Sequence, residues 1–318
     1  MTAAKPSHGR RPPTRRQTLG RALRRTLRHP LRTLRSRWRR SGISGHIGMA
    51  LGGIVAVIVV IALIMGLVRV VQWRLLIKAA EDRQTELSAE YGFDPGDIIS
   101  DSSFFDANAM SQAEIQAFLN EKGSSCSGDG CLKTKVFETS AQKADSLCGA
   151  YTADASNRQT AAGIIAKAAK ACTISPQVLL VMLQKEQHLV TATSTTDFQY
   201  EAAMGLSCPD TADCDPEYAG FFKQVFGAAK RFRYYLAHGD RYGYTVGSLS
   251  FVRYSPDSAC GGANVVIRGR ATRLLYIYTP YQPNVAALKA GAGEGDSCSS
   301  YGNRNFWLIY TDWFGSTT

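Results

Sequence analysis

The chain has 318 residues, with 37 Lys and Arg against 26 Asp and Glu, and a formal net charge of +11. The first 45 residues hold 14 of the basic side chains and no acidic one. The rest of the chain carries 23 basic and 26 acidic residues, which excludes a folded domain that is basic throughout. The positive charge therefore belongs to an N-terminal tail.

An uncharged apolar run follows this tail. Residues 47–68 read IGMALGGIVAVIVVIALIMGLV. Because a helix rises about 1.5 Å per residue, a run of this length crosses the roughly 30 Å hydrocarbon core of a bilayer. We predict a basic, disordered cytoplasmic tail over 1–45 and a transmembrane signal anchor over 46–71.

The charge distribution also predicts the orientation in the cell membrane. Basic flanks stay on the cytoplasmic side, so the chain after about Gln72 is expected outside the cell. A cleaved signal peptide is the alternative, but its apolar core has about 7–15 residues before a small-residue cleavage site. The run here is longer and no A-x-A pattern follows it, which favours an uncleaved single-pass anchor.

The basic tail predicts a membrane-lipid partner, since each basic residue near an anionic surface contributes about 1 kcal/mol. A nucleic-acid arm is the alternative. No interleaved aromatic pattern supports it, and we expect no nucleic-acid partner.

Eight cysteines all follow the apolar run, and an even number in an exported domain predicts disulfides. The sequence does not choose the pairing, although the first two and the fifth and sixth are close enough to close small loops. No C-x-x-C motif occurs, which disfavours zinc, and no metal or cofactor is expected. The cysteines are Cys126, Cys131, Cys148, Cys172, Cys208, Cys214, Cys260 and Cys298.

The outer part is predicted to be mainly α. Residues 72–97 read as a stalk, with a helix over 73–91 and a turn at Phe93-Asp94-Pro95-Gly96. Residues 98–318 have the composition of one domain. Ser111 with Glu114 forms a capping-box pattern before a helix. Further helices are predicted over 157–171, 176–190 and 218–236, and strands over 249–253 and 265–268.

The helix predicted over 176–190 carries the candidate chemistry. Ser175-Pro176 is a typical start, and the apolar block over 178–183 predicts burial on nearly all sides. The helix ends near Glu186. An apolar pocket keeps a carboxyl group protonated at neutral pH, as a glycosidase general acid requires. Alternatively, residues 185–188 simply reach solvent where the helix leaves the core.

Three segments resemble the lysozyme-like lytic transglycosylase superfamily: SPQVLLVMLQKEQ, Ala203-Met204-Gly205, and YIYTPYQPN. The chain is also similar, over residues 98–318, to actinobacterial membrane-anchored proteins labelled "hemagglutinin". These share LQKEQ, AMG-x-x-CPD, LYxYTPYxPN and YGNRNFW…TDWFG. The resemblance implies a lysozyme-like, α-rich extracellular domain.

The resemblance also implies roles for single residues. Glu186 is the general acid and base, and Met204 and Gly205 shape the cleft. Ordinary packing is the alternative for the aromatic cluster. Two positions depart from the enzyme pattern, since Gln187 replaces the usual Ser and Leu206 replaces the usual Gln. The sugar contacts implied by the resemblance are Tyr276, Tyr278, Tyr281 and Asn284.

The resulting hypothesis is a membrane-anchored protein that cleaves peptidoglycan or another cell-envelope glycan with one glutamate. A hydrolytic variant needs a second carboxylate at about 5–9.5 Å. Its candidates are Asp197, Glu201 and Asp210. The competing hypothesis is a catalytically silent surface adhesin or scaffold that binds glycan in the same cleft.

Overall fold

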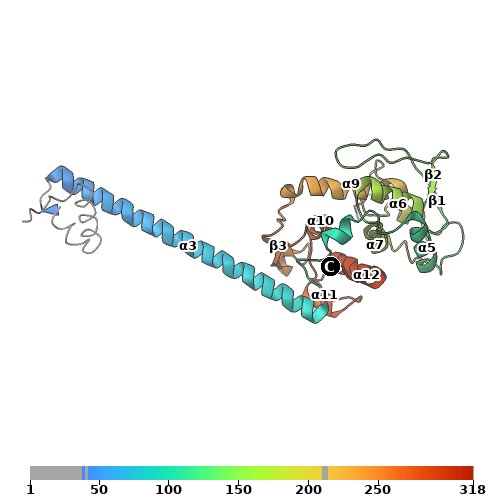
Figure 1. Cartoon of the computed structure of the whole chain (residues 1–318). Helices are drawn as coiled ribbons and strands as arrows, with labels where there is room; N and C mark the ends of the chain where they lie inside the picture. The colour runs from blue at the N-terminus through green and yellow to red at the C-terminus, as the bar shows by residue number, and fades with distance from the viewer. Residues whose placement is uncertain (1–37, 40–41, 210–213, 318) are drawn as a thin grey trace, which may run out of the picture. The chain divides into compact units, whose positions relative to one another are not determined.

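The computed structural model describes residues 38–39, 42–209 and 214–317 (Figure 1). Two compact units divide the chain, Met1–Gln72 and Trp73–Thr318. The predicted basic tail lies almost wholly outside the described residues, as does Asp210.

Within the described part of the chain, α3 (Ile43–Tyr91) is the one helix long and apolar enough to cross a membrane. No residue of its most apolar 18-residue window is buried in the protein. The predicted apolar helix is therefore confirmed by length and composition, and so is the helix predicted over 73–91. The sidedness of the membrane stays a prediction.

The last turns of α3 belong to the second compact unit. Gln84 is 1% exposed, and its side chain donates to the Val266 carbonyl at 3.3 Å and accepts from the Val266 amide at 2.8 Å. Leu87 and Phe93 are buried in the same core. Of the stalk predicted over 72–97, residues 73–97 thus belong to the unit that begins at Trp73.

The second unit is mainly α, as predicted, with two short antiparallel sheets. Val136 pairs with Thr160 in one sheet, and Leu249 pairs with Val266 in the other. In chain order its elements are α4 (Asp101–Phe105), α5 (Gln112–Lys122), β1 (Val136–Glu138), β2 (Arg158–Thr160), α6 (Ala161–Cys172), α7 (Pro176–Gln187), α8 (Asp197–Glu201), α9 (Phe221–Ala237), β3 (Leu249–Arg253), β4 (Gly262–Val266), α10 (Arg270–Tyr278), α11 (Val285–Lys289) and α12 (Gly302–Phe314), with short 3₁₀ turns at Gly239–Tyr242 and Ser258–Cys260.

Helix caps explain several of these boundaries. The predicted capping box of Ser111 and Glu114 is present at the start of α5. The helix predicted over 157–171 begins only at Ala161, because Arg158–Thr160 pairs with β1 and the Thr160 hydroxyl then caps α6. The helix predicted over 176–190 ends at Gln187.

The end of α7 has a specific cause: His188 adopts a left-handed conformation with φ 55°, which stops the helix. At the other end Ser175 makes no side-chain cap bond. Between these ends the predicted burial is confirmed, since every residue from Val178 to Leu183 is 0% exposed. α7 contacts α6 and α12 and forms the centre of the core (Figure 1).

All eight cysteines are paired, as predicted. The two small loops expected from the sequence are confirmed as Cys126–Cys131 and Cys208–Cys214. The longer links, Cys148–Cys172 and Cys260–Cys298, tie segments 24 and 38 residues apart. Such links restrict the unfolded chain and suit an oxidising compartment.

The paired bonds of Gln84 lead to a stability prediction. Replacing Gln84 with Met keeps the side-chain length but leaves the buried Val266 amide and carbonyl without that partner. We expect the free energy of unfolding to fall by about 1–3 kcal/mol. Urea unfolding of the full-length protein in detergent measures this change. The same substitution at exposed Gln112 is the control, and an equal effect at both sites contradicts the role of Gln84.

Candidate functional site

The C-terminal end of α7 places Glu186 at the edge of the core. Its side chain is 22% exposed, and that of Lys185 is 7% exposed. The Lys185 Nζ donates to Glu186 Oε1 at 2.5 Å. The sequence pattern suggested an apolar pocket around this carboxyl group. In the structure the surroundings are not wholly apolar, because one carboxylate oxygen faces an ammonium group.

The turn after α8 brings Gly205 against the same carboxylate. Gly205 has a φ of +66°, a conformation that favours glycine. A Cβ atom built at this position would lie 3.4 Å from Glu186 Oε2. The absence of a side chain at Gly205 thus leaves this second carboxylate oxygen uncovered from that direction.

Gln224 of α9 holds this turn. Its side chain is 0% exposed. Its Oε1 accepts from the amides of Met204 at 3.0 Å and Leu206 at 3.1 Å, and its Nε2 donates to the carbonyls of Leu206 at 2.8 Å and Tyr218 at 2.9 Å. Sequence reasoning missed this residue. Its signal was an amide side chain among the inward-facing aromatic residues of an amphipathic helix.

Tyr278, at the end of α10, closes the site from a third segment. Its hydroxyl donates to the Met204 carbonyl, and its ring stacks on Phe232 with centroids 5.1 Å apart. Burial raises the pKa of Tyr278 well above its ordinary value, and the negative charge of Glu186 raises it further. The phenol therefore keeps its proton at neutral pH and donates it to the Met204 carbonyl.

A cavity of about 170 Å³ opens beside these groups. We call it the turn cavity. Glu186 is not part of its wall, but the carboxylate lies next to Gly205, which is. The wall residues are Gly205, Leu206, Ser207, Arg231, Tyr235 and Tyr278.

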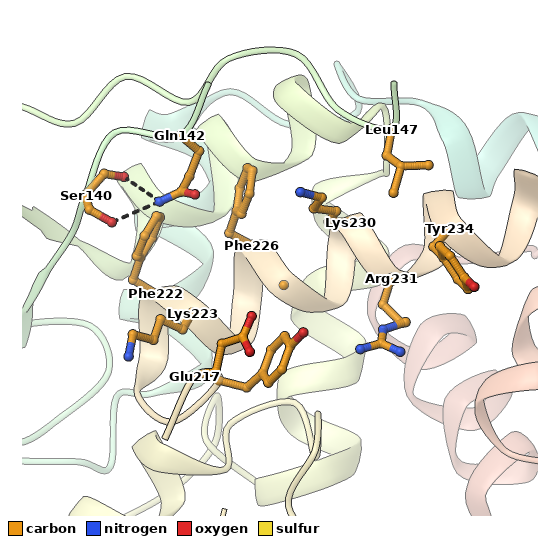
Figure 2. Close-up of a pocket in the computed structure, with 12 residues that line it drawn as sticks. Ser140, Gln142, Leu147, Glu217, Phe222, Lys223, Phe226, Lys230, Arg231 and Tyr234 are labelled. Atoms are coloured by element: carbon orange, nitrogen blue, oxygen red, sulfur yellow. Dashed lines mark hydrogen bonds between the residues drawn. The ribbon is translucent and has the colours of Figure 1, made fainter. Parts of the chain in front are cut away.

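A larger cavity of about 490 Å³ lies along α9, and Arg231 belongs to its wall as well (Figure 2). We call it the helix cavity. Phe222, Phe226 and Lys230 point from α9 toward the segment of Gln142, whereas Arg231 points to the opposite side of the helix (Figure 2). The complete wall is Ser140, Gln142, Leu147, Glu217, Tyr218, Phe222, Lys223, Phe226, Gly227, Lys230, Arg231 and Tyr234.

A third cavity, of about 580 Å³, adjoins the helix cavity and shares Ser140, Phe222 and Lys223 with it. Asp197 and Glu201 line this third cavity and not the turn cavity. Asp197 pairs with Lys135 at 3.3 Å. Among the described residues no cluster of His, Cys, Asp or Glu could hold a metal ion.

The sugar contacts implied by the resemblance separate in the structure. Tyr276 is 0% exposed and its hydroxyl donates to the Pro95 carbonyl at 2.7 Å, so the expected sugar contact is wrong for this buried ring. Asn284 caps α11 and bonds Asp296. Tyr281 forms a backbone bridge with Arg253. Of the four implied contacts, Tyr278 alone lines the turn cavity.

Comparison with known families gives one match. The profile described as the LasA, N-terminal domain matches residues 97–246. This range includes Glu186, Gly205 and Gln224, and it ends before α10 and Tyr278. No curated protein and no solved structure matches the chain.

The left-handed turn at Gly205 can be tested by Gly205→Ala. A left-handed residue with a side chain costs roughly 1–2 kcal/mol, so we expect the free energy of unfolding to fall by that amount. The added methyl group also contacts Glu186 Oε2. Urea unfolding in detergent measures the loss.

Gly243→Ala is the matched control, because Gly243 has a φ of +72° but no atom within 4 Å of the added carbon. We expect a similar stability loss without displacement of Glu186. If Gly205→Ala is as stable as the unmodified protein, the left-handed conformation assigned to Gly205 is wrong.

Proposed function

We propose that the unit Trp73–Thr318 binds a cell-envelope glycan, peptidoglycan in particular, and cleaves it with Glu186 as general acid and base. The observation that carries the proposal is that three distant segments meet beside the turn cavity, which Gly205 and Tyr278 line and which Glu186 adjoins through Gly205. Glu186 comes from the end of α7, Gly205 from the turn after α8, and Tyr278 from α10.

Glu186 carries out both proton transfers of the proposed reaction. The protonated Glu186 carboxyl group donates its proton to the glycosidic oxygen, and the bond from that oxygen to the sugar carbon breaks. The resulting carboxylate then removes a proton from the C6 hydroxyl of the cleaved sugar, whose oxygen closes a 1,6-anhydro ring. One carboxylate therefore suffices, and the glutamate is protonated again at the end. General acid–base assistance of this kind contributes about 10²–10⁴ in rate.

The neighbouring groups support this task. Gly205 leaves Glu186 Oε2 without a covering side chain on its side, which is where a glycosidic oxygen can approach. The Tyr278 ring offers an aromatic surface in the turn cavity, and aromatic faces pack on the apolar faces of sugars.

The setting of the domain supports a substrate outside the cell. The apolar helix α3 is suited to a membrane, and four disulfides favour an oxidising compartment. A lysozyme-like arrangement, in which a buried helix ends in the catalytic glutamate, is the fold that we propose for this unit. The buried block of α7, which is followed after Gln184 by Lys185 and Glu186, fits it.

A second candidate function is glycan binding without cleavage. The observation that favours it is the ion pair between Lys185 and Glu186, which ties one carboxylate oxygen to a cation in the absence of ligand. The same cavity would then present Tyr278 and Arg231 to a sugar as a surface adhesin does.

Digestion of purified peptidoglycan by the full-length protein in detergent tests the first function. We expect release of anhydro-muropeptides, identified by mass, and a loss of at least about 100-fold in Glu186→Gln. Glu294→Gln is the control, because this exposed carboxylate lies in none of the three cavities described above. Absence of digestion by the unmodified protein, with glycan still bound, contradicts cleavage and supports the second candidate.

A further inference from the structure

Arg231 occupies the junction of two cavities. It lines both the turn cavity beside Glu186 and the larger helix cavity along α9. A ligand that extends from one cavity into the other therefore passes this guanidinium group. Tyr278 lines the turn cavity, and Tyr218, whose ring lies beside the Arg231 guanidinium group, lines the helix cavity, so both provide apolar contact surface next to Arg231.

The charges of the helix cavity single out Arg231. Lys230 pairs with Asp145 at 2.5 Å. Lys223 donates to the Pro216 carbonyl at 2.9 Å. No ion pair joins Arg231 to a carboxylate of the described residues. Arg231 and Lys223 are thus the cations of this wall that pair with no carboxylate of the described residues, and the wall also carries the Glu217 carboxylate. Of the two cations, Arg231 is the one that also lines the turn cavity.

The neighbours of Arg231 hold it without neutralising it. Its guanidinium carbon lies 5.8 Å from the centroid of the Tyr218 ring. Its positive charge opposes the rise in the pKa of Tyr235 and of Tyr278, which places it near both phenols. Neutral phenols and a ring face leave guanidinium N–H donors for an acceptor that carries charge.

We infer that Arg231 binds the free lactyl carboxylate of an N-acetylmuramic acid residue that carries no peptide, next to the linkage that Glu186 acts on, so that the substrate class is an acidic glycan and not a neutral one. This inference rests on the proposed function. A planar guanidinium group donates two parallel hydrogen bonds to a carboxylate, whereas an ammonium group offers a point charge. Arg231 therefore provides selectivity for a carboxylate, and the substitution Arg231→Lys is expected to keep only part of that selectivity.

Binding of two tetrasaccharides to the full-length protein in detergent tests the inference. One alternates N-acetylglucosamine with N-acetylmuramic acid and has free lactyl carboxylates, and the other contains N-acetylglucosamine alone. We expect the acidic ligand to bind at least about tenfold more tightly, which corresponds to about 1.4 kcal/mol, because the neutral ligand offers the guanidinium group no charged acceptor. Calorimetry measures both affinities. Glu186 is kept, since its removal frees the Lys185 ammonium, and mass analysis verifies that the ligands stay intact.

The variants make the assignment specific. Arg231→Gln is expected to abolish the preference for the acidic ligand over the neutral one, and Arg231→Lys to restore that preference in part. Lys223→Gln is the matched control, because it removes a cation of the same helix that already has a carbonyl partner, and the preference is expected to remain. Equal loss in both variants overturns the assignment to Arg231.

A chemical variant of the ligand covers the case in which Arg231→Gln fails to fold. Methyl esters of the lactyl groups are expected to bind the unmodified protein like the neutral ligand. Equal binding of acid and ester overturns the inference, as does absence of binding by either tetrasaccharide.

Digestion separates this inference from the proposed function. Cleavage of acidic and neutral glycans at equal rates overturns the inference alone, and carboxylate preference without any cleavage overturns catalysis alone.

Discussion

The candidate site depends on one buried amide side chain. Gln224 accepts from the amides of Met204 and Leu206 and donates to the carbonyls of Leu206 and Tyr218. Each of these backbone groups would cost about 1–3 kcal/mol if it were buried without a partner. The bonds therefore fix the turn against α9, and the position of Gly205 against the Glu186 carboxylate follows from that.

Two other constraints meet at the same turn. The Tyr278 hydroxyl donates to the Met204 carbonyl, so α10 is joined to the backbone that Gln224 also holds. The Cys208–Cys214 disulfide begins three residues after Gly205 and closes the chain that leads to α9. The turn is thus held from α9, from α10 and by a covalent link. Such support keeps a small cavity open beside an ionised pair, where an unsupported turn would collapse.

The sequence predicted the parts of the site that follow from local patterns. The apolar block of α7 predicts its burial, and the position of Glu186 at its end follows from helix length. The sequence could not separate Tyr276 from Tyr278, because both lie in one aromatic motif. In a helix, residues two apart point in widely different directions, so Tyr276 enters the core while Tyr278 reaches the cavity. Gln224 and Arg231 could be identified only from the tertiary structure. Gln224 meets the turn at Met204 and Leu206 only in the folded chain, and Arg231 is recognised by the two cavities that it lines.

The ion pair between Lys185 and Glu186 is poorly explained by stability alone. Removing two charges from water costs several kcal/mol per ion, and their mutual attraction repays this only with good geometry and further hydrogen bonds. The Lys185 side chain is 7% exposed, yet no carboxylate of the described residues other than Glu186 pairs with it. A ligand that approaches Glu186 Oε2, as the proposed function requires, would give this ion pair a role that the stability of the fold does not supply.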